Sequence, residues 1–252
     1  MRNTSTGSHV IDTSVARSWS FEEYAPAAGP FSTLSVDFDG VDDDARTGNG
    51  AVAGATTFSL SCWVKSSTAV ASGLIARSGG GRYNYILRLT AGGQAELAFE
   101  TAASGIQTLT GTLTTLQDGA WHHVAATFDG GTLAAALYVD GYTDATAAFA
   151  AVPNDTGARR VYLGRYSTEY LPGRLDECAI YSTALSAGDV LAIYNAGAPM
   201  SLADLASSPG LVAWWRMGDG AGDAFPTIAD AKGAASLTMT NMIAADIVED
   251  AP

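Results

Sequence analysis

Two adjacent pairs of titratable residues, Asp176-Glu177 and His122-His123, are where acid–base chemistry would first be sought. Hydrolysis of a glycosidic bond, for example, needs two carboxyl groups that flank the bond at a defined separation. Each pair lies in a short run where apolar residues alternate as in a strand, and neighbouring strand residues point to opposite faces of a sheet. Neither pair is therefore predicted to converge on one bond, and we expect structural roles for all four residues.

Other catalytic and metal-binding patterns are also missing from the sequence. No serine has the glycine-flanked setting of a nucleophile elbow, and no glycine-rich run joins a strand to a helix to cradle phosphate. Cys62 and Cys178 lack the spacing of a zinc site and alternate in phase with apolar residues, which predicts two buried thiols. The sequence leaves open whether they form a disulfide, which needs Cα atoms within about 7 Å of each other. We expect no enzymatic activity.

The composition excludes several classes of partner. The chain has 252 residues, of which 47% are apolar and 15% are charged, so it can bury a sizeable core. Its net charge of −13 argues against a nucleic-acid-binding protein, which needs a basic surface. No apolar stretch approaches the roughly 18 residues of a membrane span, and a polar run follows Met1 where a signal peptide would have its apolar core. We therefore expect no membrane insertion and no export signal.

The apolar periodicity predicts an all-β protein. Two of the expected strands are joined by Asp129-Gly130-Gly131, a strong hairpin signal. One short helix is expected near 186–196, with Ser186 as its N-cap and Asp189 three residues later completing a capping box. Residues with the alternation of strands occupy 34–38, 58–65, 83–90, 121–128, 133–139, 161–164 and 175–181.

Five segments, taken in order, carry a family resemblance. They are VDFDGVDD (36–43), FSLSCWVK (58–65), DGAWHHVA (118–125), LYVDG (137–141) and GRLDECAIY (173–181), the last followed by ALS (184–186). With these segments the sequence resembles the laminin-G-like, concanavalin A-like lectin/glucanase domains, of the type found in phage structural proteins. The resemblance covers 36–197 and implies a jelly-roll β-sandwich of two antiparallel sheets, each with about six or seven strands.

The predicted organisation has three parts. Residues 1–30 are an extended N-terminal arm, with Trp19, Phe21 and Tyr24 as aromatic anchors for assembly, although a loose terminus is the competing interpretation. Residues 31–199 form the sandwich, and 200–252 form a C-terminal segment. In many relatives an apolar strand like 211–217 opens the domain, whereas here it follows the helix. We therefore expect this strand to complete either the same sandwich or that of a neighbouring copy.

The resemblance also implies a structural calcium site, since many relatives bind Ca²⁺. This hard cation takes six to eight oxygen ligands, including carboxylates and backbone carbonyls. The candidate ligands are Asp39, Gly40 and Asp42 after the first strand, joined by Asp176 if the two strands are neighbours. A solvated acidic turn is the alternative.

Sugar sites on this fold use aromatic rings for stacking, with Asn, Asp or Arg for hydroxyl groups. Two places in the sequence interleave such residues at strand ends. The alternative is that these side chains pack on the arm, on loops or on a subunit interface. The candidates are Arg82, Tyr83, Asn84 and Tyr85 in one group, and Arg165, Tyr166, Glu169 and Tyr170 in the other.

These observations predict a virion-associated structural protein, either a capsid decoration protein or a subunit of a fibre or tail. It would form homo-oligomers, contact other virion proteins, and be assembled in the host cytoplasm; adhesion to host-surface glycans is compatible with that role. The alternative is a carbohydrate-binding module of a bacterial extracellular protein. A polysaccharide-degrading enzyme is a third class, but enzymes on this fold usually carry an E-x-D-x-x-E arrangement on one strand, which this sequence lacks.

Overall fold

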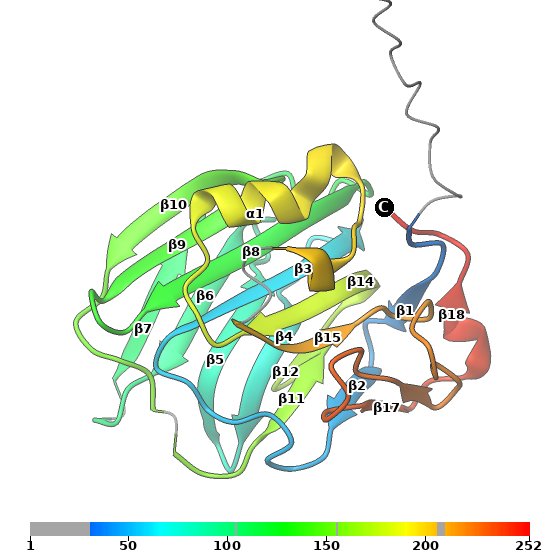
Figure 1. Cartoon of the computed structure of the whole chain (residues 1–252), viewed down its shortest axis with the longest axis horizontal. Helices are drawn as coiled ribbons and strands as arrows, with labels where there is room; N and C mark the ends of the chain where they lie inside the picture. The colour runs from blue at the N-terminus through cyan, green and yellow to red at the C-terminus, as the bar shows by residue number, and fades with distance from the viewer. Residues whose placement is uncertain (1–30, 104, 155, 206–209) are drawn as a thin grey trace, which may run out of the picture.

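The computed structural model describes residues 31–103, 105–154, 156–205 and 210–252. Within these residues the chain forms two antiparallel sheets of eight strands each, packed face to face, with one short α-helix (Figure 1). The predicted all-β sandwich is confirmed, with one more strand in each sheet than the upper expectation. The expected arm, with Trp19, Phe21 and Tyr24, lies outside the described residues.

The first sheet, sheet A, has the strand order β10-β9-β8-β3-β14-β1-β18, and β15 also pairs with β14. Its strands are β1 (Ser35–Asp39), β3 (Phe58–Ser66), β8 (Trp121–Asp129), β9 (Ala134–Val139), β10 (Tyr142–Ala148), β14 (Pro172–Tyr181), β15 (Leu211–Trp215) and β18 (Ile247–Val248).

The second sheet, sheet B, has the order β16-β17-β2-β11-β4-β5-β6-β7. Its strands are β2 (Asp44–Thr47), β4 (Ser72–Gly79), β5 (Arg82–Leu89), β6 (Ala95–Glu100), β7 (Ile106–Thr110), β11 (Arg160–Leu163), β16 (Thr227–Ile228) and β17 (Leu237–Thr240). A separate two-stranded hairpin is formed by β12 (Arg165–Tyr166) and β13 (Glu169–Tyr170).

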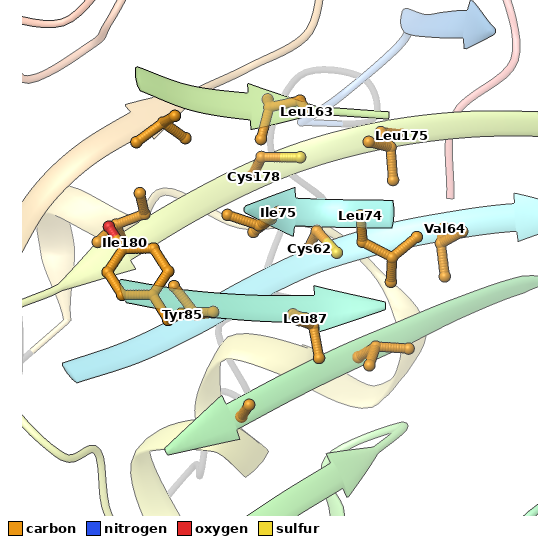
Figure 2. Packing of buried hydrophobic residues seen from close by; sticks show 14 of the residues in the cluster. Cys62, Val64, Leu74, Ile75, Tyr85, Leu87, Leu163, Leu175, Cys178 and Ile180 are labelled. Carbon is orange, nitrogen blue, oxygen red and sulfur yellow. The ribbon is translucent and has the colours of Figure 1, made fainter. Parts of the chain in front are cut away.

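The main core lies between the two sheets and follows from strand alternation. On β3, Phe58, Leu60, Cys62 and Val64 share one face, and each is fully buried in this core. Cys178 enters the same core from the neighbouring β14, and both cysteines are free thiols (Figure 2). The predicted burial of the two cysteines is confirmed.

A second apolar cluster lies on part of the outer face of sheet A. The helix α1 (Ala187–Tyr194) lies across this face and buries Val190 and Ile193 there (Figure 1). It begins at the predicted capping box, in which the Ser186 hydroxyl accepts from the Asp189 N–H and the Asp189 carboxylate accepts from the Ser186 N–H. The chain then continues through η1 (Asn195–Gly197) and η2 (Leu202–Asp204), and η4 (Ala244–Asp246) lies near the C-terminus.

The strand β15 adds to sheet A of the same chain. It pairs antiparallel with β14, with Trp214 opposite Ala179 and Trp215 opposite Cys178. The Trp215 ring is fully buried in the main core, and its Nε1 donates to the carbonyl oxygen of Ala235 at 2.8 Å. The Trp214 ring lies on the opposite side, in the outer cluster with α1.

Candidate functional site

Two tyrosines that are far apart in the sequence form an aromatic pair on the outside of sheet B. Tyr83 comes from β5 and Tyr166 from the hairpin β12–β13; their ring centroids are 5.5 Å apart and their planes are at 74°. Both side chains are partly buried, so part of each ring remains accessible. The two groups of sugar-binding candidates predicted from the sequence therefore meet at this pair.

A glycine allows the hairpin to reach this position. A Cβ atom at Gly73 of β4 would lie 2.2 Å from the backbone N of Tyr166 and 2.3 Å from the carbonyl C of Arg165. Any side chain at this position would push the hairpin away from β4. Gly73 therefore places Tyr166 beside Tyr83.

Two hollows meet at the tyrosine pair. One, of about 340 Å³, runs over the outer face of sheet B, where its lining residues alternate with the core residues Leu87 and Leu97. The other, of about 230 Å³, lies toward the β4–β5 turn. The first is lined by Tyr83, Ile86, Arg88, Glu96, Ala98, Ile106, Thr108 and Tyr166, and the second by Ser78, Gly79, Gly81, Arg82, Tyr83, Tyr166 and Ser167.

An ion network fixes the floor of the larger hollow. Arg88 donates from Nε to Glu96 at 2.7 Å and from Nη1 to both carboxylate oxygens of Glu169 at 2.8 Å. Burial disfavours the charge on Arg88, but the hydrogen bonds that it donates to Glu169 and Glu96 outweigh this effect and raise the pKa of the guanidinium. We call the surface formed by Tyr83, Tyr166 and this network the tyrosine face.

The tyrosine hydroxyls of this face remain protonated across the physiological range. Burial raises the pKa of Tyr83 to about 12, and the neighbouring Tyr166 and Glu100 add to the shift. Burial also raises the pKa of Tyr166. Each phenol can therefore donate a hydrogen bond as well as accept one.

Asn84 and Tyr85 are corrections to the predicted sugar-binding set, because both are fully buried. The Asn84 amide bonds the backbone of Ala55 and Asn154, while the Tyr85 ring packs in the main core. The register between β4 and β5 shifts at this point, so that Ser78 faces Tyr83 while Arg77 faces Tyr85. This irregularity puts Tyr83 on the outer face although Tyr85, two residues later, points inward.

The remaining predicted residues of the hairpin and strand have partners of their own. The Arg165 guanidinium lies over the rings of Tyr162 and Tyr170, at 5.4 and 5.1 Å, and pairs with Asp44 at 3.1 Å. Arg82 pairs with Glu100 at 2.8 Å at the rim of the smaller hollow. Arg165 and Tyr170 thus stabilise the hairpin.

Sequence reasoning missed Arg88 and Glu96, which hold the centre of the tyrosine face. They are directly opposite each other on β5 and β6. The signal was an arginine and a glutamate at mirrored positions around the turn Ala91-Gly92-Gly93. Opposite charges in such positions favour a cross-strand ion pair.

The acidic loop after β1 gathers three carboxylates. Asp39, Asp42 and Asp43 each place one oxygen within 4.8 Å of the others. Gly40 has φ +76°, and a Cβ there would lie 2.7 Å from the Cβ of Pro172, so the turn requires glycine. Burial raises the pKa of Asp43, and the charges of Asp39, Asp246 and Asp42 raise it further. Oxygen ligands of this kind suit Ca²⁺, so the three carboxylates fit part of a calcium shell.

Asp176 does not belong to this loop, which corrects the predicted ligand set. The strands β1 and β14 are neighbours, but their antiparallel register places Asp39 opposite Pro172. Asp176 is four residues further along β14, about 13 Å away at strand spacing. One cation cannot be ligated by both Asp39 and Asp176.

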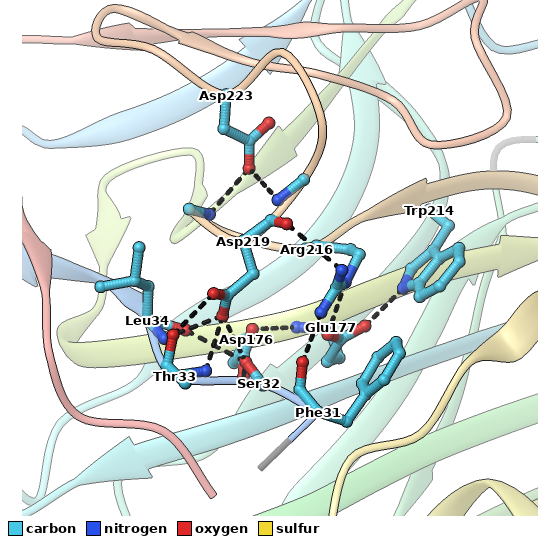
Figure 3. Close-up of polar contacts among 12 residues, drawn as sticks. Phe31, Ser32, Thr33, Leu34, Asp176, Glu177, Trp214, Arg216, Asp219 and Asp223 are labelled. Atoms are coloured by element: carbon cyan, nitrogen blue, oxygen red, sulfur yellow. Dashed lines mark hydrogen bonds and ion pairs between the residues drawn. The ribbon is translucent and has the colours of Figure 1, made fainter. Parts of the chain in front are cut away.

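Asp176 and Glu177 instead organise a buried polar cluster (Figure 3). The Ser32 hydroxyl lies between two carboxylates, 2.7 Å from Asp176 and 2.8 Å from Asp219, while the Glu177 N–H donates to Asp176 at 2.7 Å. Glu177, at φ +47°, accepts from the Trp214 indole at 2.5 Å.

Arg216 extends this cluster to the first described residues. It donates to Glu177 at 3.2 Å and to the carbonyl oxygen of Phe31 at 2.6 Å, and its guanidinium lies 4.1 Å from the centre of the Phe31 ring. Burial raises the pKa of Glu177 to about 7 against the opposing charge of Arg216. Burial also raises the pKa of Asp176, and the Glu177 charge adds to that shift. The cluster joins residues 31–34 to β14 and to the segment after β15.

No helix in the described parts of the chain combines the length and apolar character that crossing a bilayer requires.

A sequence profile described as the concanavalin A-like lectin/glucanases superfamily matches residues 39–191, more than half of the chain. No curated protein gives a significant sequence match.

Solved structures share the sandwich fold at low sequence identity. A putative carbohydrate binding protein from Bacteroides ovatus superposes with a TM-score of 0.62 and 20% identity, covering 83% of this chain and 58% of that one. A heptameric SAP-like pentraxin from Limulus polyphemus gives 0.55 and 14%, covering 66% and 84%. The CBM40 of the Ruminococcus gnavus IT-sialidase, bound to α2,3 sialyllactose, gives 0.51 and 17%, covering 65% and 99%. These likenesses establish the fold.

Proposed function

The chain belongs to the concanavalin A-like lectin/glucanases superfamily, and on that premise we propose that it binds glycans, without cleaving them, through the tyrosine face of sheet B. The observation that carries this proposal is the meeting of Tyr83 and Tyr166 over two hollows with charged rims. A pyranose ring has an apolar C–H face and a polar edge of hydroxyls. The partly exposed tyrosine rings suit the apolar C–H face of the sugar.

The polar groups around the pair suit the hydroxyls. Arg82 at the smaller hollow, and Arg88 with Glu96 at the larger one, offer donors and acceptors at the edge of a ring that stacks on tyrosine. The larger hollow, about 340 Å³, lies in the size range of small-ligand sites. The site is therefore sized for one or two sugar units.

The same geometry supports binding over hydrolysis. Three glutamates lie around the tyrosine pair: Glu96 and Glu169 are hydrogen-bonded to Arg88, and Glu100 pairs with Arg82 at 2.8 Å. Hydrolysis of a glycosidic bond needs two carboxyl groups that are free to flank that bond. These glutamates are instead engaged by arginine side chains.

The names of the structural neighbours agree with this class. One is a putative carbohydrate binding protein, and another is a CBM40 bound to sialyllactose. Display on a virion, as a decoration, tail or fibre subunit, is a narrower form of the proposal, supported by the sequence resemblance to domains of phage structural proteins. In that setting the tyrosine face would adhere to host-surface glycans; a bacterial extracellular module would use it in the same way.

A glycan array followed by titration of the best-binding glycan tests the proposal. Tyr166→Ala should weaken binding at least tenfold, because it removes half of the aromatic pair. Tyr142→Ala is the matched control, since Tyr142 is an exposed tyrosine (68%) on β10 of the other sheet. The proposal fails if no glycan binds, or if Tyr166→Ala and Tyr142→Ala bind as the unmodified chain does.

A further inference from the structure

Four side chains form one row across four neighbouring strands of sheet A. In the strand registers, Asp37 on β1 faces Arg174 on β14, Arg174 faces Lys65 on β3, and Lys65 faces Trp121 on β8. The adjacent residue Val64 points into the core, so the row lies on the outer face of the sheet. We call these four residues the cross-strand row.

The centre of this row opposes two like charges. Arg174 and Lys65 are directly opposite each other, and like charges in that position destabilise a sheet unless an anion lies between them. The chain as a whole is acidic, with a net charge of −13, so two adjacent cations are an unusual local arrangement.

A carboxylate from the C-terminal segment occupies this position. One oxygen of Asp250 accepts from Lys65 Nζ at 2.8 Å and from Arg174 Nη1, and the other accepts from Trp121 Nε1 at 3.2 Å. Donors from three strands thus converge on one carboxylate. The segment itself is held by the two-residue strand β18 and by the Ser35 hydroxyl, which donates to the Asp250 carbonyl oxygen at 2.5 Å.

A polar hollow of about 500 Å³ adjoins the row. Arg174, Lys65 and Asp37 line it together with the exposed residues Ser67 and Thr68. It therefore combines two cations with hydroxyl and carboxylate groups that can bond the hydroxyls of a ligand. An apolar acid would find few partners here, whereas a hydroxylated acid would find several.

We propose that the cross-strand row is a binding site for the carboxylate of an acidic sugar of the uronic acid type, and that Asp250 occupies it as an internal substitute that the ligand displaces. The sugar carboxylate bonds Arg174, Lys65 and the Trp121 indole in place of Asp250. Its ring extends into the hollow, where Asp37 accepts from sugar hydroxyls. This site is on the sheet opposite the tyrosine face and does not depend on it.

Calorimetric titration at low salt, with D-glucuronate as the probe, tests the site. The full chain carries Tyr166→Ala throughout, so that the tyrosine face does not contribute. Asp250→Asn, which keeps the size of the side chain and removes the competing charge, should bind D-glucuronate at least tenfold more tightly than the chain with Asp250. Adding Arg174→Gln should abolish that gain, and D-glucose, which lacks the carboxylate, should bind neither variant measurably.

Three results would overturn the proposal: no tighter binding by Asp250→Asn, a gain that survives Arg174→Gln, or acetate binding as tightly as D-glucuronate. If Asp250→Asn does not fold, the indole N–H resonance of Trp121 in the chain with Asp250 gives the answer. Saturating D-glucuronate should shift that resonance, and Arg174→Gln should remove the shift. An unmoved resonance at saturation also counts against the site.

Discussion

The outer faces of the two sheets differ in how much of each is covered by other segments of the chain. On sheet A, the helix α1 and the segment through η2 cover part of the outer face and bury a second apolar cluster that includes Tyr181 and Trp214. On sheet B, the outer face around Tyr83 and Tyr166 stays open over two hollows. The difference teaches that one sandwich can cover part of its outer surface for stability and leave other parts open for recognition.

The residues on each face explain this division. The outward residues of sheet A near α1 include Tyr138 and Ala179, whose apolar surface stabilises the fold only when it is covered. Those of β5 and β6 include Arg88 and Glu96, which pair with each other at 2.7 Å, and Arg88 also bonds Glu169 of the hairpin β12–β13. Folding segments over sheet B would bury that pair at a cost, whereas folding them over sheet A removes apolar surface from water.

Truncation of Trp214 tests the stabilising role of the covered face and should have the largest effect. Trp214→Ala removes a buried ring that stacks on Phe31 at 6.3 Å, and it leaves Glu177 without its indole donor. Loss of a buried tryptophan side chain costs about 3 to 5 kcal/mol. We expect a fall of that size in the free energy of unfolding, measured by chemical denaturation.

The matched measurement on the open face is Tyr166→Ala, which should lower the free energy of unfolding by about 1 kcal/mol. The division between the two faces is wrong if both substitutions destabilise the fold equally. It is also wrong if Trp214→Ala folds normally but loses glycan binding at the tyrosine face.

His123 gives a second test of the covered face, through pH. Its ring is fully buried beside Trp63 and Tyr194, and burial lowers its pKa to about 4. The unfolded chain binds the proton near pH 6.5, so the stability from neutral His123 is present above pH 6.5 and is lost as the pH falls through 4. The shift corresponds to about 3 kcal/mol.

The measurement compares the unmodified chain with His123→Gln from pH 6.5 to pH 4. The unmodified chain should lose about 3 kcal/mol more of its unfolding free energy over this range than the variant does. Comparing slopes is necessary because Glu177, whose pKa is raised to about 7, contributes in the opposite direction: its contribution is present below pH 4.5 and is lost as the pH rises through 7. Parallel slopes in the two proteins would contradict the assignment to His123.

Much of this fold could be predicted from local patterns. The strand β3 and the helix α1 lie where apolar periodicity and the Ser186–Asp189 box placed them. Strand β10 was not predicted, because its sequence YTDATAA lacks apolar alternation and it pairs on one side with β9. Tertiary pairing, which a local pattern does not encode, makes it a strand.

The candidate sites were predictable in composition but not in detail. Tyr83 and Tyr166 were predicted as members of two separate groups, and the hairpin that joins them depends on Gly73, whose spatial role no local pattern reveals. Tyr85 was misplaced because a register shift between β4 and β5, beside the turn Gly79-Gly80-Gly81, puts Tyr83 and Tyr85 on opposite faces. Asp176 was misplaced because the sequence does not reveal the register between β1 and β14. The two strands are neighbours, but Asp39 lies opposite Pro172.

The acidic loop joins the two sheets, because it connects β1 of sheet A to β2 of sheet B. The Asp39 N–H donates to Asp43 at 3.0 Å, and the Asp39 carboxylate accepts from Val41 at 2.7 Å, so the loop is already ordered by its own hydrogen bonds. These hydrogen bonds do not remove the mutual repulsion of the carboxylates. Burial raises the pKa of Asp43, and this repulsion raises it further. A divalent cation would offset both the burial of the charge and the repulsion.

We therefore expect Ca²⁺ to stabilise the fold modestly and to leave glycan binding at the tyrosine face unchanged. At tenfold excess over its dissociation constant, a ligand adds about 1.4 kcal/mol, which for a chain of this size raises the melting temperature by about 3 to 6 °C. Calorimetry with and without a chelator measures this shift, and Asp42→Asn, which removes one ligand and keeps the turn, should reduce it.

Asp176→Asn is the informative contrast, because the register places Asp176 outside the loop. The calcium-induced shift of this variant should equal that of the unmodified chain. A melting temperature that does not respond to calcium would remove the cation from the loop, and a shift abolished by Asp176→Asn would place it instead at the buried cluster on β14.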